Sequence, residues 1–212
     1  MNYKKLSVHT LIWAAITIIV YAVCYNYFSI SFSLWLNAHV EGSILEVMSQ
    51  YLSKLFSPRH WEILLLVSFL ISIYYLIKNK YKNAQPWLLV FISLFIASVI
   101  AFVLKVILAR ARPELLLHQH IYGFEWFSLQ HKYQSTPSGH AVLAFAGLLS
   151  IAYLLKKPIY LYLAIILAVL ISCSRVIILD HYLGDIIAGG YIGIFSYLWS
   201  RLILEKVNQR FI

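Results

Sequence analysis

The chain has 212 residues, of which 62% are hydrophobic and 12% are charged. Soluble proteins average about 45–50% apolar and about 25% charged residues, so this chain has too few charges to cover the surface of a soluble globule. Its long apolar runs, rich in aromatic residues, also exclude a disordered chain, a collagen-like repeat and a coiled coil. Cys24 and Cys173 lie in apolar runs. We expect them to be buried free thiols, outside any disulfide framework or Cys-based metal site.

Six stretches are long and apolar enough to cross about 30 Å of hydrocarbon. The first, from about Leu6 to Phe28, follows a basic segment like that of a signal peptide, but no Ala-x-Ala cleavage site follows, so we expect an uncleaved helix. The others cover about Trp61 to Ile77, Ala84 to Leu104, Pro137 to Leu155, Pro158 to Ser174 and Asp185 to Trp199. Because no internal repeat is evident, we predict one all-α membrane domain over residues 1–212, with six transmembrane helices.

The segment between the first two predicted spans, residues 29–60, mixes apolar and polar positions. Its apolar residues recur at spacings of three and four, as at Ile44, Leu45, Met48, Leu52 and Leu55. This spacing predicts an amphipathic helix that lies on the bilayer or caps the bundle on its outer side.

Basic residues are distributed unequally between the two sides of the predicted bundle. One side has ten Lys or Arg residues and only Glu205, whereas the other has seven Lys or Arg and seven Asp or Glu. The positive-inside rule places the first side, with both termini, in the cytoplasm. The net charge of +9 is then a topology signal and gives no reason to expect nucleic acid. We expect a protein of a bacterial inner membrane with its functional site facing the periplasm.

Three cations on the predicted outer side lie at the ends of apolar helices, where charge is costly, and each belongs to a short motif. In the first motif, Arg112 follows Lys105 by seven residues and precedes Pro113. A continuous helix would put Lys105 and Arg112 on one face and turn Arg110 away, and Pro113 would then end it. Taken alone, the motif also fits two interfacial cations that extend toward lipid headgroups.

The second motif is Thr136-Pro137-Ser138-Gly139-His140, at the start of the fourth predicted span. Thr136 can cap the helix, and Pro137 suits its first position. The free N–H groups that follow can bind an anion, which Gly139 allows to approach closely. Taken alone, a capped helix with an interfacial histidine is the simpler interpretation.

The third motif runs from Ser174 and Arg175 to His181 and Asp185. On a helix, His181 and Asp185 would be neighbours on one face. The carboxylate would accept the proton of one imidazole nitrogen and leave the other nitrogen free as a nucleophile. The alternative is a His–Asp pair that only satisfies its own hydrogen bonds.

The three motifs together place three cations, a helix N-terminus, two histidines and a carboxylate on one face. This set suits a phosphate group, because cations and amides hold its oxygens while one histidine attacks phosphorus and the other protonates the leaving oxygen. Nothing in the set demands a divalent metal, and we expect no metal and no cofactor.

Lys105 to Pro113, Pro137 to His140 and Ser174 to Asp185 match the motifs Lys-x6-Arg-Pro, Pro-Ser-Gly-His and Ser-Arg-x5-His-x3-Asp. With these motifs in residues 105–185, the sequence resembles the type 2 phosphatidic acid phosphatase (PAP2) superfamily of membrane lipid phosphatases. The resemblance implies that His181 is the nucleophile that forms a phosphohistidine, that Asp185 orients it and that His140 is the general acid. It also implies catalysis without a metal cofactor. The phosphate-binding residues that it implies are Lys105, Arg112, Ser138, Gly139 and Arg175.

Three features lie outside these roles. Leu179 and Asp180 stand where many relatives have a small or glycyl residue, and Asp180 adds a carboxylate near His181. The loop from Glu114 to Ser135 suits a headgroup layer, and its histidines (His118, His120 and His131) lack a recognised metal-ligand spacing. Gly189 and Gly193 predict close packing of the sixth helix.

The substrate stays open among undecaprenyl diphosphate, phosphatidylglycerophosphate, phosphatidate and the phosphates of lipid A. A lipid phosphotransferase of the same fold is the alternative enzyme. From another class, an anion transporter or channel could gather anions at Lys105, Arg112 and Arg175. A soluble haloperoxidase would share the pocket chemistry but not the six spans. The partners that we expect are the lipid substrate and the bilayer, with no obligate protein partner evident.

Overall fold

A computed structural model describes residues 2–211, and the side chains of residues 2–207. Over this range the chain is helical and forms no strand beyond one isolated bridge. The α-helices are α1 (Tyr3–Val23), α2 (Ser29–Val40), α3 (Ile44–Leu55), α4 (Pro58–Ile77), α5 (Tyr81–Leu108), α6 (Pro113–Gln119), α7 (Gly139–Leu154), α8 (Pro158–Ile177) and α9 (Leu183–Phe211). A π-helical segment (Cys24–Phe28) joins α1 to α2, and a short 3-10 helix (His131–Tyr133) lies in the loop after α6. The predicted all-α class is confirmed.

Five helical segments in the described range are long and apolar enough to cross a membrane: Tyr3–Val40, Ile44–Ile77, Tyr81–Leu108, Pro158–Ile177 and Leu183–Val207. They cover five of the six predicted spans. The remaining predicted span, Pro137 to Leu155, corresponds to α7, which is apolar but has only 16 residues. α7 packs against α4, α5, α8 and α9. Because it is apolar on all sides, it is suited to this enclosed position.

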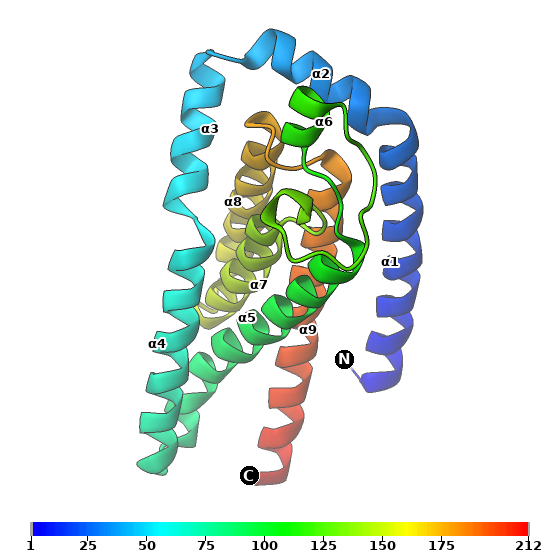
Figure 1. Ribbon diagram of the computed structural model, residues 1–212. Helices are drawn as coiled ribbons and strands as arrows, with labels where there is room; N and C mark the ends of the chain where they lie inside the picture. Colours follow the sequence, from blue (N-terminus) through cyan, green and yellow to red (C-terminus); the bar gives the residue numbers. More distant parts are fainter. Residues whose placement is uncertain (1, 212) are drawn as a thin grey trace.

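The segment between the first two predicted spans forms α2 and α3. α2 crosses one end of the bundle, and α3 descends beside α8 to meet α4 (Figure 1). The buried side of α3 carries Ser49 and Ser53, whereas Ile44, Met48 and Tyr51 are exposed. The two serines of α3 therefore face the protein, whereas several of its apolar residues face outward. Its predicted place on the bilayer surface stays a prediction.

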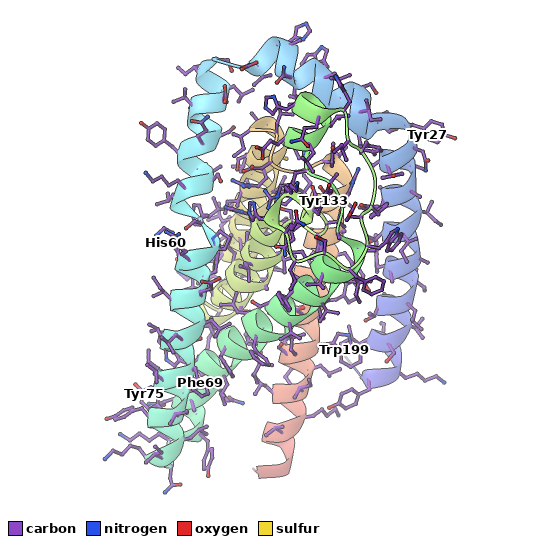
Figure 2. The ribbon with its side chains drawn as sticks, viewed as in Figure 1. Tyr27, His60, Phe69, Tyr75, Tyr133 and Trp199 are labelled. Carbon is purple, nitrogen blue, oxygen red and sulfur yellow. The ribbon has the colours of Figure 1, made fainter. Side chains whose placement is uncertain are left out.

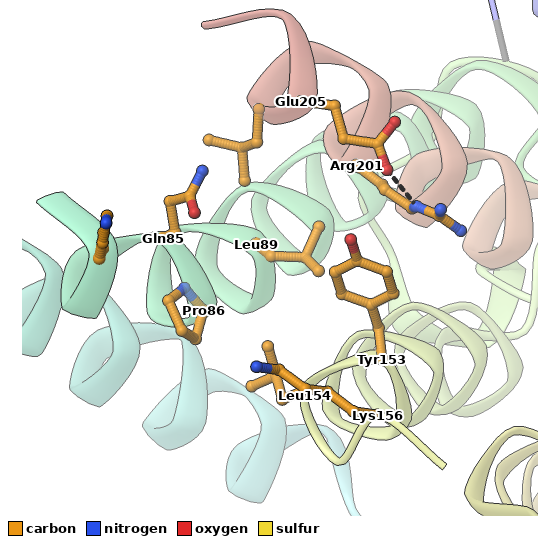
Figure 3. Close-up of a pocket in the computed structure, with 10 residues that line it drawn as sticks. Gln85, Pro86, Leu89, Tyr153, Leu154, Lys156, Arg201 and Glu205 are labelled. Carbon is orange, nitrogen blue, oxygen red and sulfur yellow. Dashed lines mark hydrogen bonds and ion pairs between the residues drawn. The ribbon is translucent and has the colours of Figure 1, made fainter. Parts of the chain in front are cut away.

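Both ends of the chain lie at the same end of the bundle, opposite α2 and α6 (Figure 1). Aromatic side chains occur near both ends, as Tyr27 and Tyr75 show (Figure 2). At the end near the termini, a cavity of about 240 Å³ is lined by Lys82, Lys156 and the Arg201–Glu205 ion pair, among others (Figure 3). These cations belong to the basic side that the sequence assigns to the cytoplasm.

The two cysteines differ in their surroundings. Both are free, but Cys24 is buried and Cys173 is exposed. The prediction of a buried thiol is thus confirmed for Cys24 and wrong for Cys173. Cys173 continues the outward apolar side of α8 that carries the exposed residues Ile166 and Leu170, so its apolar neighbours did not imply burial inside the protein.

Small residues on α9 allow it to pack closely against α7. A Cβ added at Gly193 would lie 2.5 Å from the carbonyl oxygen of Val142, and one added at Gly189 would lie 2.8 Å from the Cβ of Ala141. The close packing predicted for these two glycines is confirmed.

We expect the substitution Gly193→Ala to destabilise the protein, because the added methyl group would force the α7 and α9 backbones apart. Overpacking of this kind costs about 1–3 kcal/mol, with each kcal/mol lowering the Tm by roughly 2–4 °C in a chain of this size. Thermal unfolding in detergent measures the effect. Gly190→Ala is the matched control, since its new Cβ would meet the movable ring of Phe145 at 3.2 Å. Equal Tm values for the two variants would contradict the prediction.

Candidate active site

Lys105 lies on α5 and Arg112 immediately before α6, and the two residues do not share a helix face. The helix predicted to join them is interrupted, because Ala109 has a left-handed φ of 43° and Arg112 is extended before α6. The Nζ of Lys105 donates a hydrogen bond to the carbonyl oxygen of Gln134 at 2.7 Å, and the Nε of Arg112 donates to that of His131 at 3.0 Å. The predicted shared helix face is therefore wrong, yet both cations contact the same short stretch of loop.

The second motif forms the N-terminus of α7. The helix starts at Gly139, two residues later than predicted, with Ser138 as its N-cap residue. The predicted cap, Thr136, donates its hydroxyl to Asp185 instead. Lys105 lies beside this helix end, since a Cβ added at Gly139 would be 3.9 Å from its Cε. The buried hydroxyl of Ser138 has no hydrogen-bond partner among the described residues, and it is available for a ligand oxygen together with the free N–H groups.

His181 lies in the turn before α9, so the prediction that a helix places His181 and Asp185 one turn apart is wrong. The Nδ1 of His181 is 2.7 Å from the carbonyl oxygen of Ser135 and 3.7 Å from the Oδ2 of Asp185. Because a carbonyl oxygen only accepts, Nδ1 carries the proton and Nε2 keeps its lone pair. Burial lowers the pKa of His181 well below its ordinary value, which keeps the ring neutral at pH 7. The expected tautomer is present, but Ser135 makes the direct contact.

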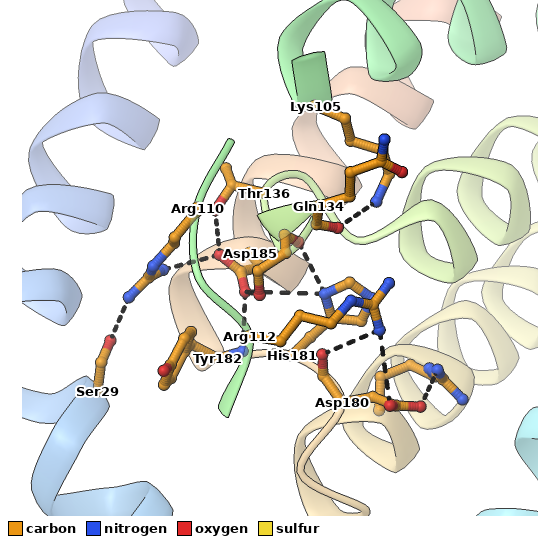
Figure 4. A network of polar contacts seen from close by, with 12 residues as sticks. Ser29, Lys105, Arg110, Arg112, Gln134, Thr136, Asp180, His181, Tyr182 and Asp185 are labelled. Carbon is orange, nitrogen blue, oxygen red and sulfur yellow. Dashed lines mark hydrogen bonds and ion pairs between the residues drawn. The ribbon is translucent and has the colours of Figure 1, made fainter. Parts of the chain in front are cut away.

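Asp185 accepts hydrogen bonds from four groups and is fully buried. Its Oδ1 accepts from Arg110 at 2.7 Å and from the hydroxyl of Thr136. Its Oδ2 accepts from the hydroxyl of Ser135 at 2.6 Å and from the backbone N–H of Tyr182 at 2.9 Å (Figure 4). The last bond satisfies an N–H group at the start of α9, as in a capping box. Asp185 thus fixes the start of α9 and the segment that holds His181.

Arg110 is the residue of this network that the sequence interpretation missed. It was predicted to point away, but it is completely buried, and it donates hydrogen bonds to the hydroxyls of Tyr21, Ser29 and Tyr122 as well as to Asp185. Its guanidinium carbon lies 4.1 Å from the ring centroid of Tyr182, within cation–π range. In the sequence, Asp185 could have indicated the role of Arg110, because an acid at the start of an apolar span needs a buried cation.

His140 and Arg175 meet at a serine of α3. The Nε2 of His140 is 3.2 Å from the carbonyl oxygen of Ser53 and 3.4 Å from its hydroxyl. Arg175 donates a hydrogen bond to the same hydroxyl, and its buried Nε has no partner in the described part of the chain. α3, for which the sequence predicted no role in the site, therefore contributes to it.

The loop after α6 is directed inward, onto the site. Tyr122, His131, Gln134 and Ser135 contact Arg110, Arg112, Lys105 and Asp185, respectively. The positive charge of Arg112 lowers the pKa of His131 below its ordinary value. Within residues 2–207, no group of three His, Cys, Asp or Glu side chains is arranged to hold a metal ion.

A helix N-terminus, three cations and two buried histidines lie together in a bundle of apolar helices, five of which are long enough to cross a membrane within the described range. The family model of the PAP2 superfamily matches residues 86–209, more than half of the chain. The chain belongs to the PAP2 superfamily.

Curated relatives include lipid phosphatases. The chain is 30% identical over 147 residues to a lipid A 1-phosphatase of Rhizobium johnstonii, covering 65% of this chain and 58% of the relative. It is 36% identical over 124 residues to an undecaprenyl-diphosphatase of Sulfolobus acidocaldarius, covering 56% and 57%. The chain thus spans about three-fifths of the length of the curated relatives that it matches.

Two solved structures share the fold. One is a PAP2-type phosphatidylglycerolphosphate phosphatase from Bacillus subtilis, with a TM-score of 0.61, 20% identity and 96% of both chains covered. The other is Aquifex aeolicus LpxE, with a TM-score of 0.56, 23% identity and coverage of 84% of this chain and 97% of that chain.

We expect the substitution Arg110→Gln to destabilise the protein strongly. It would leave the carboxylate of Asp185 buried without its cation, and breaking a buried pair in this way costs about 3–5 kcal/mol. Thermal unfolding in detergent checks the effect, with Arg59→Gln as a matched control at an exposed arginine. Arg110→Lys should recover only part of the stability, because an ammonium group cannot reproduce the planar fork of donors. A wild-type Tm for Arg110→Gln would show that the pair is not needed.

Proposed function

We propose that the protein is a lipid phosphatase that removes a terminal phosphate from a lipid phosphate or diphosphate through a phosphohistidine intermediate. The observation that carries the proposal is the neutral, buried His181, whose Nδ1 is committed to the carbonyl oxygen of Ser135 and whose Nε2 keeps its lone pair. A nucleophilic histidine needs this tautomer.

In the proposed first step, the Nε2 of His181 attacks phosphorus and the bond from phosphorus to the leaving oxygen breaks. Lys105, Arg112 and Arg175 stabilise the negative charge on the other phosphate oxygens, together with the hydroxyl of Ser138 and the first N–H groups of α7. No step in this scheme requires a metal or another cofactor.

His140 supplies the proton for the leaving oxygen. Its Nε2 faces the carbonyl oxygen of Ser53 at 3.2 Å. Because a carbonyl oxygen only accepts, this nitrogen carries a proton, and the proton that His140 gives to the leaving oxygen is the second N–H proton of its imidazolium form, which leaves a neutral ring. In the second step, the deprotonated His140 takes a proton from water, the water oxygen bonds to phosphorus, and the bond from phosphorus to His181 breaks. Inorganic phosphate leaves, and both histidines return to their starting states.

The proposed substrate class is a lipid with a terminal phosphate. The site lies at one end of a bundle with several helices that can cross a membrane, and curated relatives act on lipid A and on undecaprenyl diphosphate, as their names state. The four lipid classes considered from the sequence all remain candidates. A phosphotransferase would use the same first step and pass the phosphoryl group to a lipid hydroxyl in place of water.

We expect His181→Ala to abolish phosphate release, because the variant lacks the proposed nucleophile. The assay measures phosphate released in detergent, with EDTA, from each of the four lipid classes, and orthovanadate should inhibit the wild-type protein. His60→Ala is the matched control, since His60 is exposed on α4 and is assigned no part in the site. Unchanged turnover in His181→Ala would refute the mechanism. Anion flux through liposomes without phosphate release would favour the transporter.

We also propose that α7 is the sixth span and that the termini are cytoplasmic, as the charge bias indicates. In a variant whose two native cysteines are replaced by serine, a cysteine at Ser128 should react with a membrane-impermeant maleimide in intact cells. A cysteine at Lys80 should react only after the membrane is permeabilised. The reverse labelling pattern would invert the topology.

A further inference from the structure

The carboxylate of Asp180 lies between two of the arginines proposed to bind the substrate phosphate (Figure 4). Its Oδ2 accepts a hydrogen bond from Arg175, and its Oδ1 is 3.6 Å from the Nη1 of Arg112. The two arginine side chains are 9% and 10% exposed, whereas that of Asp180 is 38% exposed. The carboxylate therefore neutralises two buried guanidinium groups from the solvent side.

The backbone presents Asp180 to these arginines. After α8 ends at Ile177, Leu179 adopts a left-handed φ of 56°, a conformation that side chains other than glycine rarely adopt. The backbone N–H groups of Asp180 and His181 both donate to the carbonyl oxygen of Arg175, at 3.0 and 3.1 Å. This turn fixes the start of the Asp180 side chain beside Arg175. The carboxylate itself makes no hydrogen bond or ion pair with other described residues beyond those to the two arginines.

We propose that Asp180 is an internal anion that the substrate must displace, and that it thereby keeps the phosphodiester headgroups of bulk lipids from occupying the site. This inference rests on the proposed function. When a phosphate group enters, its oxygens replace the carboxylate on Arg112 and Arg175, and the half-exposed side chain turns toward solvent.

The physical basis is competition. An anion that binds only after an internal ion pair opens loses apparent affinity by the fraction of protein in the open state. The same factor applies to every anion, so the ratio of two affinities is unchanged, but a weak binder no longer occupies the site at a concentration at which a strong binder still does. A phosphodiester carries one negative charge, whereas a terminal phosphate carries about −1.5 to −2 at pH 7. Asp180 thus keeps the abundant diesters from occupying the site.

The test compares the wild-type protein with Asp180→Asn, which has nearly the same shape but cannot form an ion pair. Two quantities are measured in detergent: the Kd of inorganic phosphate by calorimetry, and the inhibition of lipid phosphate turnover by dioleoylphosphatidylglycerol, a phosphodiester. Asp180→Glu restores the carboxylate. Glu125→Gln is the matched control, because it removes one exposed negative charge from the loop after α6, and no ion pair among the described residues joins Glu125 to either arginine.

We expect Asp180→Asn to tighten phosphate binding about tenfold or more, since hydrogen bonds to charged groups are the strong ones. The phosphodiester should then inhibit this variant at concentrations that leave the wild-type protein unaffected. Asp180→Glu and Glu125→Gln should both behave like the wild type.

Unchanged or weaker phosphate binding in Asp180→Asn would overturn the proposal, because Asp180 would then only position the arginines. Equal tightening in Glu125→Gln would also overturn it, as a general charge effect, and so would the absence of measurable phosphate binding in every protein. Failure of the proposed function would show separately, as a wild-type protein that releases no phosphate from any lipid. The Kd comparison needs no turnover and still decides the role of Asp180.

Discussion

The buried ion pair between Arg110 and Asp185 is the interaction on which the rest of the site depends. Both side chains are fully buried, and the desolvation of two charges is offset only when further hydrogen bonds satisfy them. Hydroxyls from α1, α2 and the loop after α6 supply such bonds on the Arg110 side, and Ser135 and Thr136 supply them on the Asp185 side. The pair therefore ties the end of α5 and the segments before α7 and α9 into one arrangement, and Ser135 in turn fixes the tautomer of His181.

Local sequence signals predicted the elements of this fold but not the geometry of the site. Hydropathy predicted the helices because the apolar residues of a membrane span follow one another in the sequence. The small residues Gly189 and Gly193 predicted the close contact of α9 with α7. The predictions that two residues share a helix face were wrong at two places where the chain is not helical, at Ala109 and before Leu183. The contact between Arg110 and Asp185 joins residues 75 positions apart, and no local spacing encodes such a pairing.

The loop after α6 illustrates the same limit. Its mixture of aromatic, acidic and histidine residues suggested a headgroup layer or plain solvation. In the structure, its carbonyl oxygens and hydroxyls face the cations and the carboxylate of the site. Backbone carbonyl oxygens accept the hydrogen bonds from Lys105 and Arg112, and every residue type has a backbone carbonyl. A sequence therefore gives no sign that Gln134 or His131 holds a cation through its main chain.

The two carboxylates of the third motif have opposite properties because their burial differs. Asp185 is fully buried and accepts four hydrogen bonds, so moving it would leave Arg110 and the start of α9 without partners. Asp180 is 38% exposed, and within the described part of the chain its carboxylate makes hydrogen bonds or ion pairs with the two arginines alone, so water can solvate its charge when another anion arrives. In the proposed mechanism, a fixed acid orients the nucleophile and an exchangeable acid occupies the arginines between substrates. The proposed site needs both, because accurate placement of the nucleophile alone would not prevent phosphodiester headgroups from binding to the three cations.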